Sequence, residues 1–173
     1  MPLHTLFLLL LLSPCLALAQ SAFYAGADAG YTDIRQGDFD DDWGYRAYGG
    51  YRLHEAWSIE IGYADLGSFD INRTGLTGTA DVTDVFDISI VLGGTVLKPY
   101  NTRMELKLGA YDADVKTDFP NRPDTDGDSG YTTGISIIQP IGVHFDGVFS
   151  WRYYDEIDDI DITSYMFGVR YRF

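Results

Sequence analysis

The feature that most constrains this chain is an alternation of apolar side chains with small or charged ones, which recurs eight times along the sequence. Successive side chains of a β-strand point to opposite faces, so an alternation of period two gives each strand one apolar and one polar face. The closing stretch YMFGVRYRF is the clearest case. The pattern predicts strands within residues 23–31, 45–51, 57–63, 86–96, 104–110, 131–137, 143–153 and 165–173.

The connections between these strands alternate in length. Tight turns are expected at LHEA, KPYN and QPIG, whereas the other joints are long and polar: DIRQGDFDDD, DLGSFDINRTGLTGTADVTD, DVKTDFPNRPDTDGDSG and DEIDDID. No later stretch shows sustained helical periodicity or a continuous apolar span. The sequence therefore predicts an all-β fold, an eight-stranded antiparallel up-and-down transmembrane β-barrel with both termini at the short-turn end.

The N-terminal stretch LFLLLLLSPCLALAQ predicts a secretory signal peptide. An apolar run ends in Ala17-Leu18-Ala19, which is typical of a cleavage site, although the basic region before it is weak and a retained anchor helix is the alternative. We expect residues 1–19 to be cleaved, and Cys15 to leave with them, so that residues 20–173 form one barrel domain without cysteine chemistry.

The polar face of the strands distinguishes a membrane barrel from a soluble barrel with an apolar interior. That face is rich in glycine and carries charges of both signs, which suit a narrow lumen filled by side chains. The apolar face has aromatic residues near both strand ends, as the two membrane interfaces favour. We expect a lumen ionic core drawn from Glu60, Asp87, Arg103, Glu105, Lys107, Asp146, Arg152 and Arg170, with Arg170 or Lys107 as the partner of Glu60.

Three stretches carry a resemblance to a known family. FYAGADAGYTD (23–33) looks like the first strand, and RAYGGYRLHEAWSIEIGYADLG (46–67) like the second hairpin, of the OmpA-type outer-membrane β-barrel proteins of Gram-negative bacteria. The terminal strand is similar to the family's assembly signal, which would give Tyr171 and Phe173 that role. The resemblance implies a monomeric cell-envelope surface protein in the outer membrane, in contact with lipid, lipopolysaccharide and the barrel assembly machinery. It also implies a barrel domain only, without the peptidoglycan-binding domain of larger members.

Acidic residues are concentrated in the long connections. These hold 20 of the 26 acids, in a chain of formal charge −14, which disfavours nucleic acid and lets divalent cations bridge to lipopolysaccharide. A weak calcium-loop pattern places Asp124, Asp126 and Asp128 at alternate positions, but Ile135 stands where such a loop needs a bidentate Glu.

The sequence predicts a surface role in envelope integrity or adhesion, with a lipid A-modifying enzyme and a small pore as the alternatives. A lipid A-modifying barrel needs a hydrogen-bonded Ser, His and carboxylate, whereas HFD places Asp146 where a Ser is expected and His144 is assigned to the lumen. We therefore expect no catalytic residue and no cofactor. A small gated pore is the other alternative, although eight strands leave little lumen.

Overall fold

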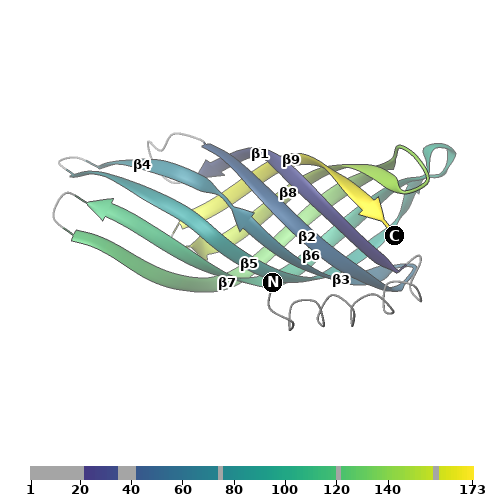
Figure 1. Cartoon of the computed structure of the whole chain (residues 1–173), viewed down its shortest axis with the longest axis horizontal. Coiled ribbons are helices and arrows are strands. Elements are labelled where there is room, and N and C mark those ends of the chain that lie inside the picture. The colour runs from purple at the N-terminus through teal and green to yellow at the C-terminus, as the bar shows by residue number, and fades with distance from the viewer. Residues whose placement is uncertain (1–21, 35–41, 74–75, 120–121, 158–159) are drawn as a thin grey trace, which may run out of the picture.

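The computed structural model describes residues 22–34, 42–73, 76–119, 122–157 and 160–173, so the expected signal peptide and Cys15 lie outside the described residues. The described part of the chain is almost entirely strand (Figure 1). No helix within it is long and apolar enough to cross a membrane. The elements are β1 (Phe23–Ile34), β2 (Asp42–His54), β3 (Trp57–Asp65), β4 (Gly67–Arg73), β5 (Leu76–Leu97), η1 (Lys98–Tyr100), β6 (Thr102–Phe119), β7 (Arg122–Pro140), β8 (Phe145–Ile157) and β9 (Ile160–Arg172).

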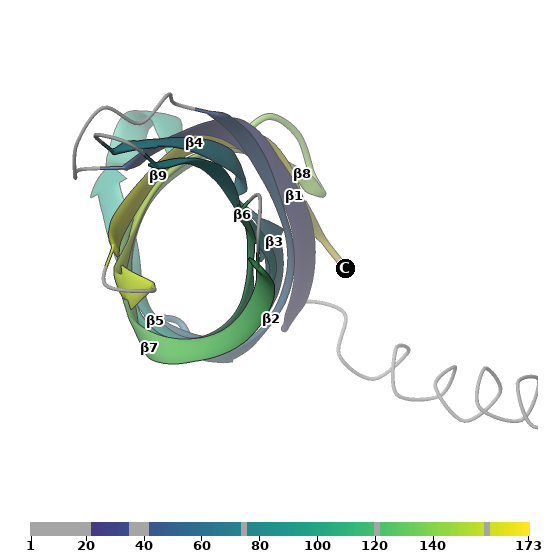
Figure 2. The same cartoon turned by 90° about the vertical axis from the view of Figure 1, so that its left-hand side faces the viewer.

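The strands close into an antiparallel barrel, seen end-on in Figure 2. Except for β3 and β4, consecutive strands pair along the chain, and β1 also pairs with β9. Both β3 and β4 pair with β5, so together they occupy one position in the wall. The prediction of an eight-stranded up-and-down barrel is therefore confirmed. Closure pairs every described strand on both sides within the membrane wall, which stabilises a sheet in lipid. Beyond it, residues 122–131 of β7 pair only with β6, and β4 pairs only with β5.

The break between β3 and β4 lies opposite a bulge in β5. Gly67 has φ +97°, a conformation that side chains with a Cβ rarely adopt, and Asp84 in the facing strand has φ +59°. The Leu66 N–H still donates to the Val82 carbonyl at 3.0 Å across the break. Paired irregularities of this kind shift which residues face inward without opening the wall.

The outer wall of the part of the barrel nearer the short turns is apolar and exposed. Ile61, Ile88 and Phe167 are 62%, 56% and 69% exposed, and many neighbours are similar. A continuous surface of this kind is unstable in water and suits the hydrocarbon layer of a membrane. Exposed aromatic residues lie toward both ends of this wall: Tyr31, Trp43, Tyr45, Phe86, Tyr131 and Tyr165 at one, and Phe23, Tyr51, Trp57, Tyr100, Phe145, Tyr171 and Phe173 at the other.

Two of the four connections expected to be long loops are mostly strand. In the described part of these connections, residues 67–73 form β4 and residues 76–84 the first part of β5, while residues 114–119 and 122–130 form the facing ends of β6 and β7, which extend past the other strands in Figure 1. Strand continues because the alternation of side chains continues, with its chemistry inverted. In β6, Tyr111, Ala113 and Val115 are buried, whereas Asp112 and Asp114 are exposed.

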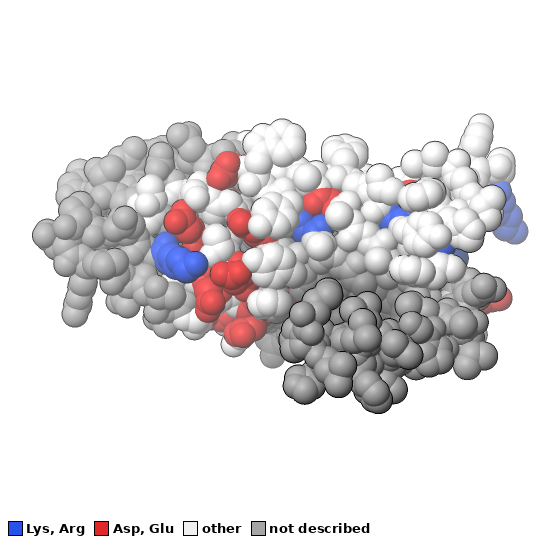
Figure 3. All heavy atoms as spheres, in the orientation of Figure 1, with Lys and Arg blue, Asp and Glu red and all other residues white. Residues whose placement is uncertain are grey.

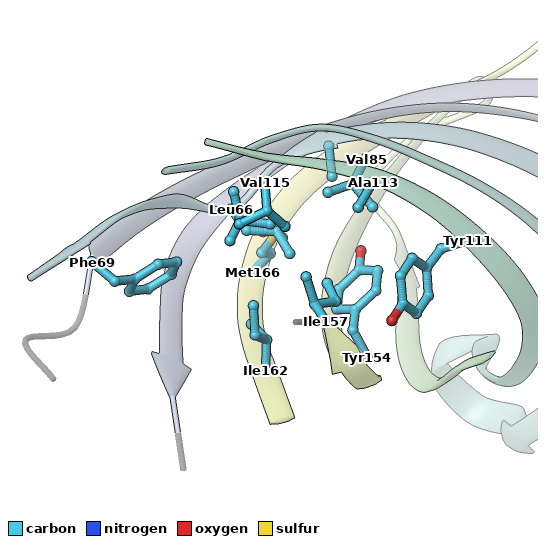
Figure 4. Packing of buried hydrophobic residues seen from close by; sticks show 12 residues of the cluster. Leu66, Phe69, Val85, Tyr111, Ala113, Val115, Tyr154, Ile157, Ile162 and Met166 are labelled. Atoms are coloured by element: carbon cyan, nitrogen blue, oxygen red, sulfur yellow. The ribbon is translucent and has the colours of Figure 1, made fainter. Parts of the chain in front are cut away.

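The extension therefore has an apolar interior. Its cluster of buried side chains comes from six strands (Figure 4): Ala64, Leu66, Phe69, Val82, Val85, Tyr111, Ala113, Val115, Tyr154, Ile157, Ile162 and Met166. We call this set the apolar cluster. Between the apolar cluster and the short turns, the lumen is polar and the outer wall is apolar. At the level of the apolar cluster, the interior is apolar and the outer surface is polar. Such a reversal is what a barrel needs where it leaves lipid and enters water.

The opposite end of the barrel has short turns, as expected. One strand boundary differs from the prediction: β8 begins at Phe145, after a bend in which the N–H groups of Ile141 and Gly142 both donate to the Phe145 carbonyl. His144 consequently lies exposed in the turn, and its assignment to the lumen was wrong.

Candidate functional site

The middle of the lumen holds a buried cluster of five charged side chains, which we call the central cluster: Arg46, Glu60, Asp87, Lys107 and Arg152. The Lys107 Nζ donates to both Glu60 oxygens, at 2.7 and 3.0 Å, and Arg46 donates to the same carboxylate at 3.1 Å. Each side chain is at most 5% exposed. Charges so deeply buried are tolerated because they are paired and hydrogen-bonded.

Asp87 completes the central cluster. It accepts two hydrogen bonds from the Arg46 guanidinium, at 3.0 and 2.9 Å, and one from Arg152 at 2.9 Å. Two parallel N–H···O bonds between a guanidinium and a carboxylate fix the geometry as well as the charge balance. Arg46 thus links both acids of the cluster, from β2 to β3 and β5.

Two tyrosines from neighbouring strands fill the space beside the central cluster. The Tyr24 hydroxyl donates to Glu60 at 3.0 Å, and the Tyr48 ring lies 4.9 Å from both Arg46 and Lys107. These rings lie against glycines: a Cβ on Gly26 would come within 2.4 Å of Tyr48, and one on Gly50 within 2.0 Å of Tyr24. The lumen glycines therefore make room for large side chains.

A second group of charges lies nearer the short turns, and we call it the turn-end cluster: Glu105, Asp146, Arg170 and Arg172. Arg170 donates to both Glu105 oxygens at 3.0 Å and to Asp146 at 3.2 Å. Arg172 lies 3.0 Å from the same Asp146 carboxylate. The two clusters fill the lumen at two levels of the membrane wall.

Of the residues proposed for an ionic core, the structure brings Glu60, Asp87, Lys107 and Arg152 together in the central cluster, and Glu105, Asp146 and Arg170 in the turn-end cluster. Of the two partners considered for Glu60, Lys107 contacts it and Arg170 binds other acids. Arg103 joins neither cluster, because its guanidinium donates to the Glu55 carbonyl at 3.1 Å. Arg46 belongs to the central cluster but not to the ionic core predicted from the sequence, although its alternation with Gly44 and Tyr48 places it in the lumen.

The outer face of the extension carries an acidic rim, a name we use for eight described residues above the upper aromatic residues: Asp33, Asp65, Asp81, Asp84, Asp112, Asp114, Asp155 and Asp161. Figure 3 shows acidic side chains gathered there around a basic one. The Tyr63 hydroxyl donates to Asp84 at 2.7 Å, and Lys116 lies 3.8 Å from it. Asp65 and Asp155 also accept hydrogen bonds, whereas the side chains of Asp112 and Asp114 are exposed to solvent or to an external partner.

The calcium-loop interpretation of Asp124, Asp126 and Asp128 does not fit the backbone. These residues lie in β7 rather than in a loop, and alternate residues of a strand stand about 6.6 Å apart without converging. The side chains of Asp124 and Asp126 lie outside the described residues. Among the described residues, no group of three or more His, Cys, Asp or Glu is arranged to hold a metal ion.

The residues weighed for catalysis lie in separate hydrogen-bond networks. The His144 Nδ1 is 2.9 Å from the Arg172 carbonyl, and its ring stacks on Tyr171. Ser150 donates to Asp28 at 3.0 Å inside the lumen. Tyr171 and Phe173 of the expected assembly signal pack edge to face on the outer wall, with ring centroids 5.1 Å apart.

A family model described as the outer membrane protein beta-barrel domain matches residues 5–173. No curated protein matches the chain significantly.

Three solved structures illustrate the likeness of fold. The attachment invasion locus protein Ail of Yersinia pestis is 13% identical, with 89% of this chain and 99% of that chain covered and a TM-score of 0.62. OprG of Pseudomonas aeruginosa is 12% identical, with 90% of this chain and 98% of that chain covered and a TM-score of 0.64. The N-terminal barrel domain of OprF from the same organism is 10% identical, with 89% of this chain and 100% of that chain covered and a TM-score of 0.59. Ail has also been crystallised with the heparin analogue sucrose octasulfate.

Proposed function

Because the chain belongs to the family of outer membrane β-barrel proteins and lies in the outer membrane, we propose that it serves as a surface structural and interaction protein of the cell envelope. The observation that carries the proposal is the extension, in which the apolar cluster holds an acidic outer surface above the membrane wall. A packed interior keeps that surface in one shape, as a binding or supporting surface requires.

The acidic rim favours a partner that is basic, or an anionic one reached through divalent cations. Ail was crystallised with an analogue of heparin, a polyanion, but the rim of this chain would repel such a ligand. With the extension facing outward, the rim lies just above the apolar wall, where it would meet the phosphates of lipopolysaccharide. Cations shared between rim carboxylates and those phosphates would anchor the barrel in the outer leaflet.

The proposal is tested by reconstituting the protein in lipopolysaccharide vesicles with and without Mg²⁺. Mg²⁺ should raise the urea midpoint of unfolding, and the double substitution Asp112→Asn with Asp114→Asn should remove about a quarter of that rise, since it removes two of the eight rim carboxylates over which the cation contacts are spread. Glu55→Gln removes an exposed acid at the turn end and serves as the matched control. An equal Mg²⁺ effect in all three proteins would exclude bridging by the rim.

A pore and an enzyme are less well supported. A water path would have to cross both the central cluster and the apolar cluster, and Ser150 and His144 bind different partners.

A deletion strain distinguishes the three functions. We expect envelope leakiness or weaker adhesion with an unchanged lipid A mass profile. A changed profile that is restored by the intact protein but not by His144→Ala would favour the enzyme.

A further inference from the structure

We propose that the lumen mouth at the turn end is a binding site for a small oxyanion of the phosphate class. The mouth is a cavity of about 160 Å³, and four arginines from three strands line it: Arg52, Arg103, Arg170 and Arg172. Asp146 is the acid in the same lining. The site lies below the central cluster and is separate from the acidic rim, so it adds a second ligand to the proposed surface role.

The arginines of the mouth are not balanced by acids. Glu105 and Asp146 pair with Arg170, and Asp146 is shared with Arg172. Arg52 and Arg103 form no ion pair in the described part of the chain. Four positive charges therefore face two negative ones, although the chain as a whole has a formal charge of −14. In such an acidic protein, an excess of cations at one place is a local feature that an anion would complement.

Unused hydrogen-bond donors point to the same ligand. The Arg103 Nε is buried without a hydrogen-bond partner, and among the described residues only the Nη2 of its guanidinium donates a hydrogen bond, to the Glu55 carbonyl. Arg52 is half-buried, and no described residue accepts a hydrogen bond from its guanidinium. A guanidinium binds a tetrahedral oxyanion through two N–H groups at once, and low-dielectric walls strengthen that attraction. A bound anion would also relieve the repulsion between the two arginines.

The size of the mouth selects among phosphate-bearing ligands. About 160 Å³ holds inorganic phosphate together with ordered water, but it does not hold the glycerol backbone and chains of a lipid. The mouth also opens inside the ring of strands rather than on the lipid-facing wall. We therefore assign the site to a free small anion.

The test uses the protein purified from outer membranes into an uncharged detergent. Phosphate is titrated at constant ionic strength set with chloride, and binding is followed by ³¹P line broadening and by the urea midpoint of unfolding. Phosphate should raise the midpoint. Arg52→Gln and Arg103→Gln should each weaken phosphate binding about tenfold, because each removes one charged hydrogen-bond donor. Neither substitution strands a buried acid, so both proteins should fold.

Lys98→Gln is the matched control, since it removes an exposed positive charge at the same end but outside the mouth. Its phosphate affinity should equal that of the unsubstituted protein. The proposal is overturned if chloride stabilises as well as phosphate, or if both arginine variants bind phosphate normally. It is also overturned if phosphatidylglycerol vesicles stabilise the protein relative to phosphatidylcholine vesicles while free phosphate does not, since the ligand would then be a lipid headgroup.

Discussion

At the scale of single residues, Glu60 is the side chain on which the lumen most depends. It is fully buried and accepts hydrogen bonds from Lys107, Arg46 and Tyr24. The cluster contains three bases and two acids, so loss of one acid leaves buried cations facing each other. Removal of one member of a buried ionic group is far more costly than its replacement by a packed apolar group.

Glu60→Ala should therefore destabilise the folded barrel by about 3–5 kcal/mol in urea unfolding, because Lys107 loses its carboxylate partner. Lys107→Ala in the same protein should cost less than the sum of the two single substitutions, with a coupling of about 1–3 kcal/mol. Arg170→Ala is the matched comparison, since Arg170 binds Glu105 and Asp146 and should couple weakly to Glu60. Strict additivity of Glu60 and Lys107 would contradict the pairing.

At the scale of elements, β6 shows how one strand serves two environments. Glu105 and Lys107 face a polar lumen, and further along the strand Tyr111, Ala113 and Val115 face the apolar cluster. The outward residues change in the opposite sense, from Leu106 and Leu108 to acids. In β5 and β8 the bulges between Thr83 and Phe86 and between Tyr154 and Ile157 keep apolar residues inward where the simple alternation would not.

Val115→Asp should loosen the extension without unfolding the membrane barrel. A buried, unpaired carboxylate costs about 3 kcal/mol or more, and the cost falls on the apolar cluster alone. Hydrogen exchange should become faster for the β6 amides after Tyr111 and for the β7 amides before Gly130, which pairs with Tyr111. It should stay slow for the β6 amides between Arg103 and Gly109. Asp114→Asn on the outer face is the matched control and should change neither group. Uniform loss of protection along β6 would show that the extension and the barrel unfold together.

At the scale of the whole molecule, closure between β1 and β9 and the apolar wall together make this a membrane protein. The extension and the short turns lie at opposite ends of the barrel (Figure 1). Because acids are concentrated at one end and the expected signal peptide delivers the chain from the other side, we predict that the extension faces outward.

Single cysteines test this orientation on intact cells. Asp112→Cys should react with a membrane-impermeant thiol reagent, since this side chain is exposed on the extension, whereas Lys98→Cys at the turn end should not react. Both should react after cell lysis, which controls for burial of the thiol. The reverse labelling would show that the barrel is inverted.

The last strand allows a test of assembly. Phe173→Ser should reduce insertion into the membrane in cells several-fold but change refolding in detergent little. Phe173 is 42% exposed and packs against Tyr171 at the end of the wall, so the burial lost in the folded barrel is small. Tyr100→Ser removes an exposed aromatic side chain at the same end and is the matched control. Equal losses in both assays would indicate a structural role for Phe173 rather than a signal.

The sequence by itself determined the barrel, the number of strands in its wall and which residues of the membrane-spanning strands face lipid. The period of two gives the strands and their two faces, the alternating connection lengths give the up-and-down order, and the glycine-rich, charged face marks the lumen. The stretch GAYDADVK also held the signal for the extension, as an alternation of inverted polarity, but an acidic composition resembled that of a loop. Only the tertiary structure decided which lumen charges meet. Glu60 is paired with Lys107 from another strand because the stagger between strands, which no local pattern encodes, sets their heights in the lumen. The same stagger brings Arg52, Arg103 and Arg170 to one mouth, although they lie far apart in the chain.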